Sequence, residues 1–337
     1  MLYGILSDKL GENKIIVLTA VAAFILTFIL LARPFGFLPR DGGKFVTDKD
    51  GNKVEVNKGS SGKVTGVGLL MVIVWLLLIF LLFPVNFTME GHAESGGFAF
   101  FLCLSFLMMM MGYLDDVARA PWGELIKGML DLVLAVTASV TFVLFNSTDV
   151  VFFGNEIHIP KVLYVVLATA LIWASINVTN CSDGVDGLCG SVSAIEIVGY
   201  AYIFKRTYFS AAGLVFAFIL VAYLAYNWNP SKVLMGDAGS RTIGFWMAIL
   251  AMMSGHPFSF LLMSLVFIFD GGLGLLRLVL LRLTKSKVTF LKNVRFPFHD
   301  QLRKNMGWKV PYIALFFAGL EIVFVVIMTL IIKQFGL

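Results

Sequence analysis

Long apolar stretches separated by short polar segments make up most of this chain. Two of them, Ile15–Ala32 and Leu69–Phe83, contain no charged residue. A helix that crosses a bilayer needs about 20 mostly apolar residues, and most of the stretches reach or approach that length. The pattern predicts ten membrane-spanning helices, at about 15–32, 67–85, 98–114, 125–145, 161–179, 188–204, 209–226, 241–254, 258–283 and 311–332. The eighth is short and the ninth is long, so we expect a tilt or a break in that part of the chain.

The composition confines the chain to one class of protein. Of its 337 residues, 59% are hydrophobic and 14% are charged, against about 45–50% and about 25% in soluble domains. This excludes a soluble enzyme, a disordered protein, a nucleic-acid-binding domain and a secreted disulfide scaffold. No internal repeat is visible. We therefore expect an all-α polytopic integral membrane protein, with residues 1–337 forming a single domain and the lipid bilayer as its partner.

The Lys and Arg residues between the predicted spans indicate the orientation. The first loop (33–66) and the ninth loop (284–310) each contain seven of them. Odd-numbered loops hold sixteen in total, whereas even-numbered loops and the two termini hold five. Because basic residues are enriched in cytoplasmic loops, the odd loops are expected in the cytoplasm and both termini outside.

The first loop also contains a predicted β-hairpin. Lys44–Val56 has two short β-prone stretches on either side of Asp50-Gly51, and Asp-Gly is a favoured two-residue hairpin turn. A small hairpin is therefore expected in the first cytoplasmic loop.

Acidic and amide side chains gather at the ends of the predicted spans. Such groups are costly near membrane depth, and their positions therefore indicate function. Under the orientation derived above, all the clusters fall on the cytoplasmic side. They are Asp115-Asp116 in the third loop, Asn177, Asn180, Asp183 and Asp186 in the fifth, Asn227 and Asp237 in the seventh, and His299 in the ninth.

Each cluster alone has a simpler interpretation. Asp115-Asp116 could end a span in solvent, and Asp237 could be a turn or helix-cap residue. The polar residues of 177–186 recur every third position, which would spread them over half of an ideal helix. Gly184 and Gly187 favour instead an unwound segment, and polar backbone at membrane depth is tolerated where it lines a cavity.

Together, the clusters are typical of phosphate chemistry with a divalent cation. Mg²⁺ prefers hard oxygen ligands and commonly takes one or two carboxylates together with substrate phosphates and water. Lys and Arg side chains can neutralise a diphosphate, and Asn can contact a base or a sugar.

At these motifs the chain resembles the polyprenyl-phosphate N-acetylhexosamine-1-phosphate transferases, in the same order from Gly62 to Trp308. Asp115-Asp116 is similar to the paired aspartates of that family, Asn177–Leu188 to its Asn-rich Asp-Gly-x-Asp-Gly-Leu loop, and Met235–Ser240 to its Met-Gly-Asp motif. Within the family the likeness is to the bacterial phospho-N-acetylmuramoyl-pentapeptide transferases, through Gly62–Gly68, Lys127 and Pro297–His299 with Gly307-Trp308.

The resemblance implies a reaction and its setting. Phospho-N-acetylmuramoyl-pentapeptide would pass from UDP to undecaprenyl phosphate, releasing UMP and forming lipid I, the first lipid-linked intermediate of peptidoglycan synthesis. It also implies ten helices with both termini outside, a requirement for Mg²⁺, an active face on the cytoplasmic side of a bacterial plasma membrane and, as a further expectation, a homodimer.

The resemblance also implies roles for individual residues. Asp237 is the expected metal ligand. Asp115 would act on the lipid phosphate as a base, a nucleophile or a positioning group, with Asp116 beside it. The nucleotide and sugar would be bound by Asn177, Asn180, Asp183, Asp186 and Asn227, and Lys127 and His299 would complete the polar pocket.

Ser60, Arg119 and three further positions depart from the muramoyl branch. Its usual three histidines correspond here to His299-Asp300-Gln301, and a usually aromatic position corresponds to Leu234. A related transferase that uses UDP-N-acetylglucosamine is therefore the main alternative. A secondary transporter is a distant alternative. Transporters often show repeat symmetry and bind substrates near the midplane, whereas this chain has no visible repeat and its polar clusters are expected on one side of the membrane.

Overall fold

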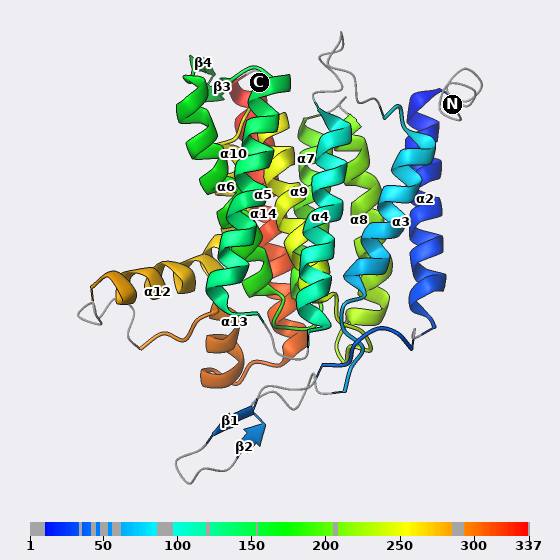
Figure 1. Ribbon diagram of the computed structural model, residues 1–337, viewed down its shortest axis with the longest axis vertical. Helices are drawn as coiled ribbons and strands as arrows, with labels where there is room; N and C mark the ends of the chain where they lie inside the picture. Colours follow the sequence, from blue (N-terminus) through cyan, green and yellow to red (C-terminus); the bar gives the residue numbers. More distant parts are fainter. Residues whose placement is uncertain are drawn as a thin grey trace.

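The computed structural model describes residues 11–33, 36–41, 45–47, 53–55, 62–85, 97–118, 122–152, 154–204, 208–284 and 293–335. Over these residues the helices run side by side and form one bundle (Figure 1). Six helices within them are long and apolar enough to cross a membrane: α2 (Glu12–Leu31), α4 (Phe98–Asp116), α5 (Glu124–Phe145), α6 (Lys161–Ser182), α8 (Tyr208–Asn227) and α14 (Val310–Phe335). The expected class, a helical membrane protein, is confirmed.

Three shorter helices complete the bundle: α3 (Gly68–Leu82), α7 (Leu188–Ile203) and α9 (Gly236–Met253). Every residue of α9 from Ala238 to Met252 is buried, as is typical of a helix at the centre of a core. The rings of Trp75 on α3 and Trp246 on α9 pack edge to face with their centroids 4.6 Å apart. Phe216 of α8 stacks on Trp75 at 4.9 Å. This aromatic cluster joins α3, α8 and α9 in the middle of the bundle.

The outer helices present large apolar side chains away from the core. Ile29 of α2, Leu125 of α5, Val162 of α6 and Leu330 of α14 are each at least 60% exposed. An apolar surface of this extent would be unfavourable in water and is suited to lipid.

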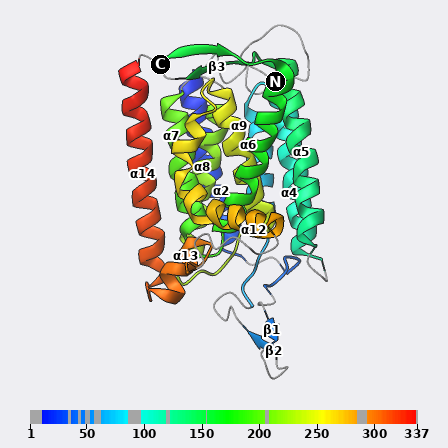
Figure 2. The same cartoon turned by 90° about the vertical axis from the view of Figure 1, so that its left-hand side faces the viewer.

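The ninth apolar stretch is broken into four pieces, as its length suggested. They are α10 (Ser259–Met263), α11 (Leu265–Phe267), the π-helical segment η1 (Ile268–Gly272) and α12 (Leu273–Leu283). Asp270, Gly271 and Gly272 lie within η1, and π-helical turns and glycines are common causes of helix kinks. Beyond this point α12 projects sideways from the bundle (Figures 1 and 2), and none of its residues is buried.

The two ends of the bundle carry different elements. At one end lie β1 (Phe45–Thr47) and β2 (Lys53–Glu55), together with α13 (Phe298–Asp300) and the π-helical segment η2 (Gln301–Asn305). We call this the β1–β2 end. At the opposite end lie the start of α2, the end of α14 and a second hairpin of β3 (Asp149–Phe152) and β4 (Asn155–His158) (Figure 1).

The hairpin expected in the first loop is confirmed by antiparallel pairing of Val46 with Val54. Its Asp50-Gly51 turn lies outside the described residues. The second hairpin was missed by the sequence analysis. Its pairing of Phe152 with Asn155 closes around Gly154, which has a φ of 80°. The signal was a glycine between two β-prone stretches.

Helices lie at all ten expected positions, but two boundaries were wrong. The eighth helix begins at Gly236 instead of 241, so the Met-Gly-Asp motif enters the first turn of α9 and is not a loop. An acidic residue is favourable there, because it interacts with the positive end of the helix dipole. Likewise, α6 continues to Ser182. Asn177 and Asn180 are therefore helical, and the turn begins only at Asp183.

Candidate active site

Helices α3, α4 and α9 approach one another backbone to backbone at the β1–β2 end. A Cβ atom on Gly68 would lie 2.7 Å from the carbonyl oxygen of Met235, and one on Gly112 would lie 2.5 Å from the backbone nitrogen of Ala238. These separations are shorter than van der Waals contact, so only glycine permits the approach. It brings the last turn of α4 against the first turn of α9.

Asp237 lies at the centre of the resulting polar cluster. Its Oδ1 accepts a hydrogen bond of 2.9 Å from Nδ2 of Asn180 on α6. Its Oδ2 lies 3.2 Å from Nζ of Lys127 on α5 and 3.1 Å from Nε of Arg241, one turn further along α9. Three helices thus contribute to one carboxylate, and two cations compensate its charge.

The paired aspartates at the end of α4 have different partners. Asp115 is buried, forms an ion pair with Lys127, and accepts a 2.7 Å hydrogen bond from the backbone N–H of Trp122. Asp116 accepts hydrogen bonds from the backbone N–H groups of Asp237 and Ala238, at 3.2 and 3.3 Å. Asp116 therefore caps the start of α9, whereas Asp115 shares a lysine with Asp237.

A second ion pair lies deeper in the bundle. Asp131, which is fully buried on α5, contacts NH1 of Arg241 at 2.8 Å. Asn177 donates to Asp131 at 3.5 Å and to the backbone oxygen of Trp173 at 2.8 Å. Asn177 therefore contacts this deeper pair and not Asp237. The sequence analysis missed Asp131 and Arg241, although an acid inside a predicted span is itself a signal of function.

A separate cluster forms around Asp186, in the turn between α6 and α7. Its carboxylate accepts hydrogen bonds from Nδ2 of Asn229 at 3.0 Å, and from the backbone N–H and hydroxyl of Ser231 at 3.1 and 2.8 Å. Nζ of Lys63 lies 3.5 Å away. Burial acts to raise the pKa of Asp186, but these hydrogen bonds and Lys63 outweigh it and hold the pKa below its ordinary value.

Lys63 reaches Asp186 because the first loop packs on the seventh. Val64 forms an isolated bridge with Val233, and the backbone N–H of Leu234 donates to the carbonyl of Val64 at 2.8 Å. In the sequence, Lys63 counted toward the orientation and as part of the Gly62–Gly68 motif, but it was not assigned to the site. Its link to Asp186 could not be read from the chain because the two residues are far apart in sequence.

The remaining polar residues of the fifth and seventh loops have distinct environments. Asn227 is buried, accepts the N–H of Gly187 at 2.9 Å and donates to the carbonyl of Val233 at 2.9 Å. It therefore ties the turn after α6 to the end of α8. Asp183 begins that turn. Desolvation raises its pKa, and the carboxylates of Asp237 and Asp116 raise it further.

His299 is held by an acid that the sequence analysis did not select. Its backbone N–H donates to Oδ1 of Asp270 at 2.6 Å, and its Nδ1 lies 2.8 Å from Oδ2 of the same carboxylate. Asp300 pairs instead with Arg303 and Lys304, each at 2.6 Å, and Gln301 accepts the N–H of Arg295 at 2.9 Å. The two residues that replace histidines of the family pattern thus bind within their own segment.

The carboxylates suit a magnesium ion that is shared with a substrate. No group of three or more His, Cys, Asp or Glu in the described part of the chain is arranged to hold a metal alone. Asp116 and Asp237 nevertheless meet at the first turn of α9. Since Mg²⁺ commonly takes one or two protein carboxylates plus phosphate oxygens and water, this donor set fits a metal that binds together with a diphosphate.

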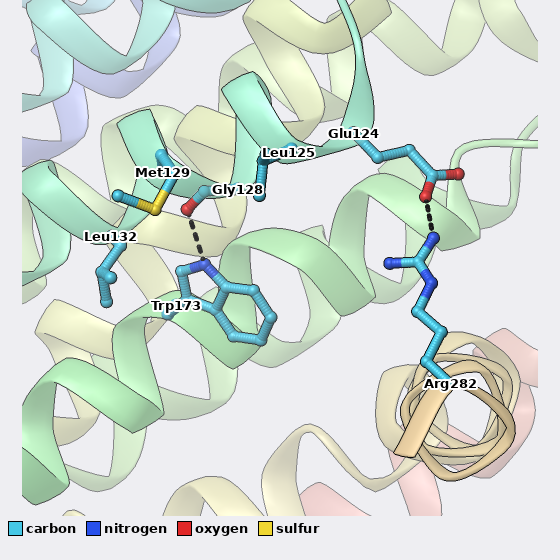
Figure 3. A pocket seen from close by; sticks show the side chains of 7 residues that line it. All are labelled: Glu124, Leu125, Gly128, Met129, Leu132, Trp173 and Arg282. Atoms are coloured by element: carbon cyan, nitrogen blue, oxygen red, sulfur yellow. Dashed lines mark hydrogen bonds and ion pairs between the residues drawn. The ribbon is translucent and has the colours of Figure 1, made fainter. Parts of the chain in front are cut away.

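An apolar cavity of about 890 Å³ lies between α5, α6 and α12. Figure 3 shows Leu125, Gly128, Met129 and Leu132 of α5 along one side and Trp173 of α6 on the other. Trp173 donates a 3.0 Å hydrogen bond to the backbone oxygen of Gly128. At one side, Arg282 of α12 and Glu124 of α5 form an exposed ion pair of 2.6 Å. The same helix, α5, thus carries Lys127 toward the carboxylates and apolar residues toward the cavity.

The structure brings most of the expected residues into two adjacent groups. Asp115, Asp116, Lys127, Asn180 and Asp237 form one network. Asp186 forms the centre of the other, with Asn227 fixing the turn between them. Asn177 and His299 are bound to Asp131 and Asp270, which were not predicted.

Several bacterial enzymes are similar to this chain in sequence. Residues 98–255 match the model of glycosyl transferase family 4. The phospho-N-acetylmuramoyl-pentapeptide-transferase of Treponema pallidum (strain Nichols) is 35% identical over 327 residues, which cover 89% of this chain and 84% of that protein. Proteins of the same description from Microcystis aeruginosa and Staphylococcus epidermidis are 30% and 26% identical, over 61% and 86% of this chain and 61% and 92% of their own. The chain therefore belongs to the phospho-N-acetylmuramoyl-pentapeptide transferases of glycosyl transferase family 4.

Proposed function

We propose that this protein transfers phospho-N-acetylmuramoyl-pentapeptide from UDP to undecaprenyl phosphate, with release of UMP and formation of lipid I. The observation that carries the proposal is the meeting of Lys127, Asp115, Asp116 and Asp237 at one end of the bundle, beside an apolar cavity on the same helix. Such a site can receive an anionic head and an apolar chain together.

The acceptor lipid, undecaprenyl phosphate, has a charged head and an apolar chain, and α5 offers a polar face for the one and an apolar face for the other. Lys127 and Asp131 lie one helical turn apart and contact Asp237 and Arg241 of α9, respectively, whereas Leu125, Gly128, Met129 and Leu132 line the cavity. In this assignment Lys127 binds the phosphate of the polyprenyl acceptor, and the cavity takes the first part of its chain. The exposed apolar surface of the bundle gives such a lipid a route from the bilayer.

The donor fits the groups on the other side of Asp237. Lys63 and Arg241 supply positive charge for a diphosphate, and the Asp186 cluster supplies a carboxylate, a hydroxyl and an amide for the nucleotide. Asn180, which already donates to Asp237 and Ser240, can turn its amide toward the sugar phosphate.

In the proposed reaction an oxygen of the lipid phosphate attacks the phosphorus attached to the sugar. A new P–O bond forms, the bond to UMP breaks, and UMP leaves with the electron pair. A lipid phosphate is already anionic at neutral pH. Asp115 is engaged by Lys127 and by the N–H of Trp122. We therefore favour direct attack with Asp115 as a positioning group over a two-step route through an aspartyl phosphate.

We further propose that the reaction requires Mg²⁺, with Asp237 as the protein ligand and Asp116 beside it. A bound Mg²⁺ would neutralise the charge that develops on the diphosphate during transfer. Lys127, Arg241 and Lys63 supply the remaining positive charge from this chain.

The membrane arrangement that we propose has ten spans, both termini outside and the β1–β2 end in the cytoplasm of a bacterial cell. Its support is the sixteen basic residues of the odd-numbered loops, together with the placement of the start of α2 and the end of α14 opposite the site (Figure 1). A homodimer stays a prediction of the family resemblance.

A second candidate donor is UDP-N-acetylglucosamine, because the chain departs from the muramoyl pattern at Leu234 and at Asp300-Gln301. The test incubates purified protein and undecaprenyl phosphate with each donor in parallel, with Mg²⁺ or with EDTA, and follows both UMP and lipid product. Product from the muramoyl donor alone supports the proposal, and product from the glucosamine donor alone replaces it. Silence with both, in folded protein, refutes a transferase of either kind.

A further inference from the structure

Asp270 is a fully buried acid in the broken ninth stretch, and the proposed reaction has not used it. It lies in η1, among Ile268, Phe269 and two glycines, and its exposed fraction is 0%. A carboxylate at such depth is unfavourable unless it is paired or hydrogen-bonded. Both of its oxygens bind the same residue, His299, one through the backbone N–H and one through the ring.

This double contact determines the orientation of the imidazole. A carboxylate only accepts hydrogen bonds, so the nitrogen 2.8 Å from Oδ2, Nδ1, must carry the proton. Nε2 is then the nitrogen available to other groups. The second bond, from the backbone N–H of His299 at 2.6 Å, fixes α13 relative to η1 and leaves the ring little freedom to turn.

The available nitrogen points at the turn between the two polar groups. A Cβ atom on Gly184 would lie 2.7 Å from Nε2 of His299, so the ring edge rests on a residue without a side chain. Gly184 lies between Asp183 and Asp186. The carboxylate of Asp183 is near enough to those of Asp237 and Asp116 for electrostatic repulsion, and Asp186 binds Lys63. A larger residue at 184 would displace the ring from this position.

We propose that Asp270 is a positioning residue for His299, holding the Nδ1–H tautomer so that the lone pair of Nε2 is presented as an acceptor to a hydroxyl or amide N–H of the nucleotide sugar. This inference rests on the proposed function for the identity of that ligand.

The test uses Asp270→Asn, His299→Ala and the double variant, with Asp300→Asn as the matched control. In Asp270→Asn the amide oxygen can still accept the backbone N–H of His299, but the amide nitrogen then faces Nδ1 and imposes the opposite tautomer. Removal of a group that orients a histidine typically lowers activity about 10–100-fold. We expect that loss in kcat/KM for Asp270→Asn. The double variant should be no slower than His299→Ala, because Asp270 acts through His299. Asp300→Asn should keep wild-type activity, since Asp300 binds Arg303 and Lys304.

A spectroscopic measurement separates this inference from the proposed function. The chain has four histidines, so ¹⁵N-histidine labelling gives a small set of ring signals, and His299→Ala identifies one by its loss. We expect the signal of His299 to show the Nδ1–H tautomer in the wild-type protein and the Nε2–H tautomer in Asp270→Asn.

The possible outcomes are distinct. Wild-type kcat/KM in Asp270→Asn, or losses that simply multiply in the double variant, would overturn the positioning role. A wild-type spectrum with the Nε2–H tautomer would overturn the geometry. If the protein transfers neither sugar phosphate, the tautomer shift still tests the contact between Asp270 and His299, and only the nucleotide sugar as the ligand of Nε2 is lost.

Discussion

The approach of α4 to α9 can be tested by adding one methyl group, with Gly112→Ala. In an ordinary helix this substitution stabilises the protein by about 0.5–1 kcal/mol, because glycine is the more flexible residue. Here the new Cβ would lie 2.5 Å from the backbone nitrogen of Ala238, whereas ordinary contact begins at 3.4 Å. Backbone atoms cannot rotate away, so α4 and α9 must separate by about 1 Å.

That displacement would break specific contacts. The hydrogen bonds from the N–H groups of Asp237 and Ala238 to Asp116 measure 3.2 and 3.3 Å, and a further 1 Å or so would take both beyond bonding range. Overpacking of this kind costs about 1–3 kcal/mol. A misplacement of about 1 Å among catalytic groups can lower the rate about 100-fold. We expect both effects in Gly112→Ala.

The assay measures the initial rate of lipid product and the melting temperature of the purified protein. The control is Gly319→Ala in α14, where nothing lies within 4 Å of the new Cβ, and it should match or slightly exceed the wild-type melting temperature at full activity. A Gly112→Ala protein with wild-type rate and stability would refute the argument that this glycine contact sets the position of Asp116 against Asp237.

Three further predictions concern single side chains. Asp237→Asn should lower turnover by at least about 100-fold while the protein stays folded, because the charge that binds Lys127, Arg241 and the proposed metal is lost; near-normal Mg²⁺-dependent turnover would remove Asp237 from the metal site. Asp186 has a lowered pKa, so its stabilising contribution is present above the unfolded value of about 4 and is lost as the pH falls through the lowered value. The difference in melting temperature between the wild-type protein and Asp186→Asn should therefore shrink in acid, and a pH-independent difference would contradict this. Glu321→Gln should keep or raise the melting temperature, because both oxygens of this buried carboxyl lack a partner within the described residues; a large drop would indicate that a bound cation compensates the charge.

The helices could be predicted from the sequence because each is surrounded by the apolar interior of the bilayer along its length. A helix there needs apolar residues over a fixed length, and stretches such as Leu69–Phe83 meet this requirement through their own sequence. The break in the ninth stretch also followed from its length.

Helix boundaries at the site could not be predicted in the same way. The segment from Gly236 to Arg241 reads as a polar loop, yet it forms the start of α9. Its charges are tolerated because Lys127, Asn180 and Asp131 come from other helices. The sequence of this segment alone does not show that these partners are nearby.

Most residues of the candidate site could be predicted from the sequence, but the partners to which they bind could not. Asp115, Asp116 and Asp237 were expected on one side of the membrane, and the structure brings them together at the β1–β2 end. Asp131 and Asp270 were overlooked because they lie inside predicted spans and away from the loops. A buried acid inside a membrane span is energetically unfavourable, and this was the available signal. Asp131 and Asp270 are the partners of Arg241 and His299.

The complete burial of α9 has a consequence for the precision of the site. The outer surface of a helix lies about 5–6 Å from its axis, so a rotation of about 10° would swing the carboxylate of Asp237 through about 1 Å. Because every residue from Ala238 to Met252 is enclosed, such a rotation would force Trp246 against Trp75 and Phe209. The aromatic packing in the middle of the bundle therefore sets the angle at which Asp237 faces Lys127 and Asn180, so residues far from the first turn of α9 fix the geometry of the candidate site.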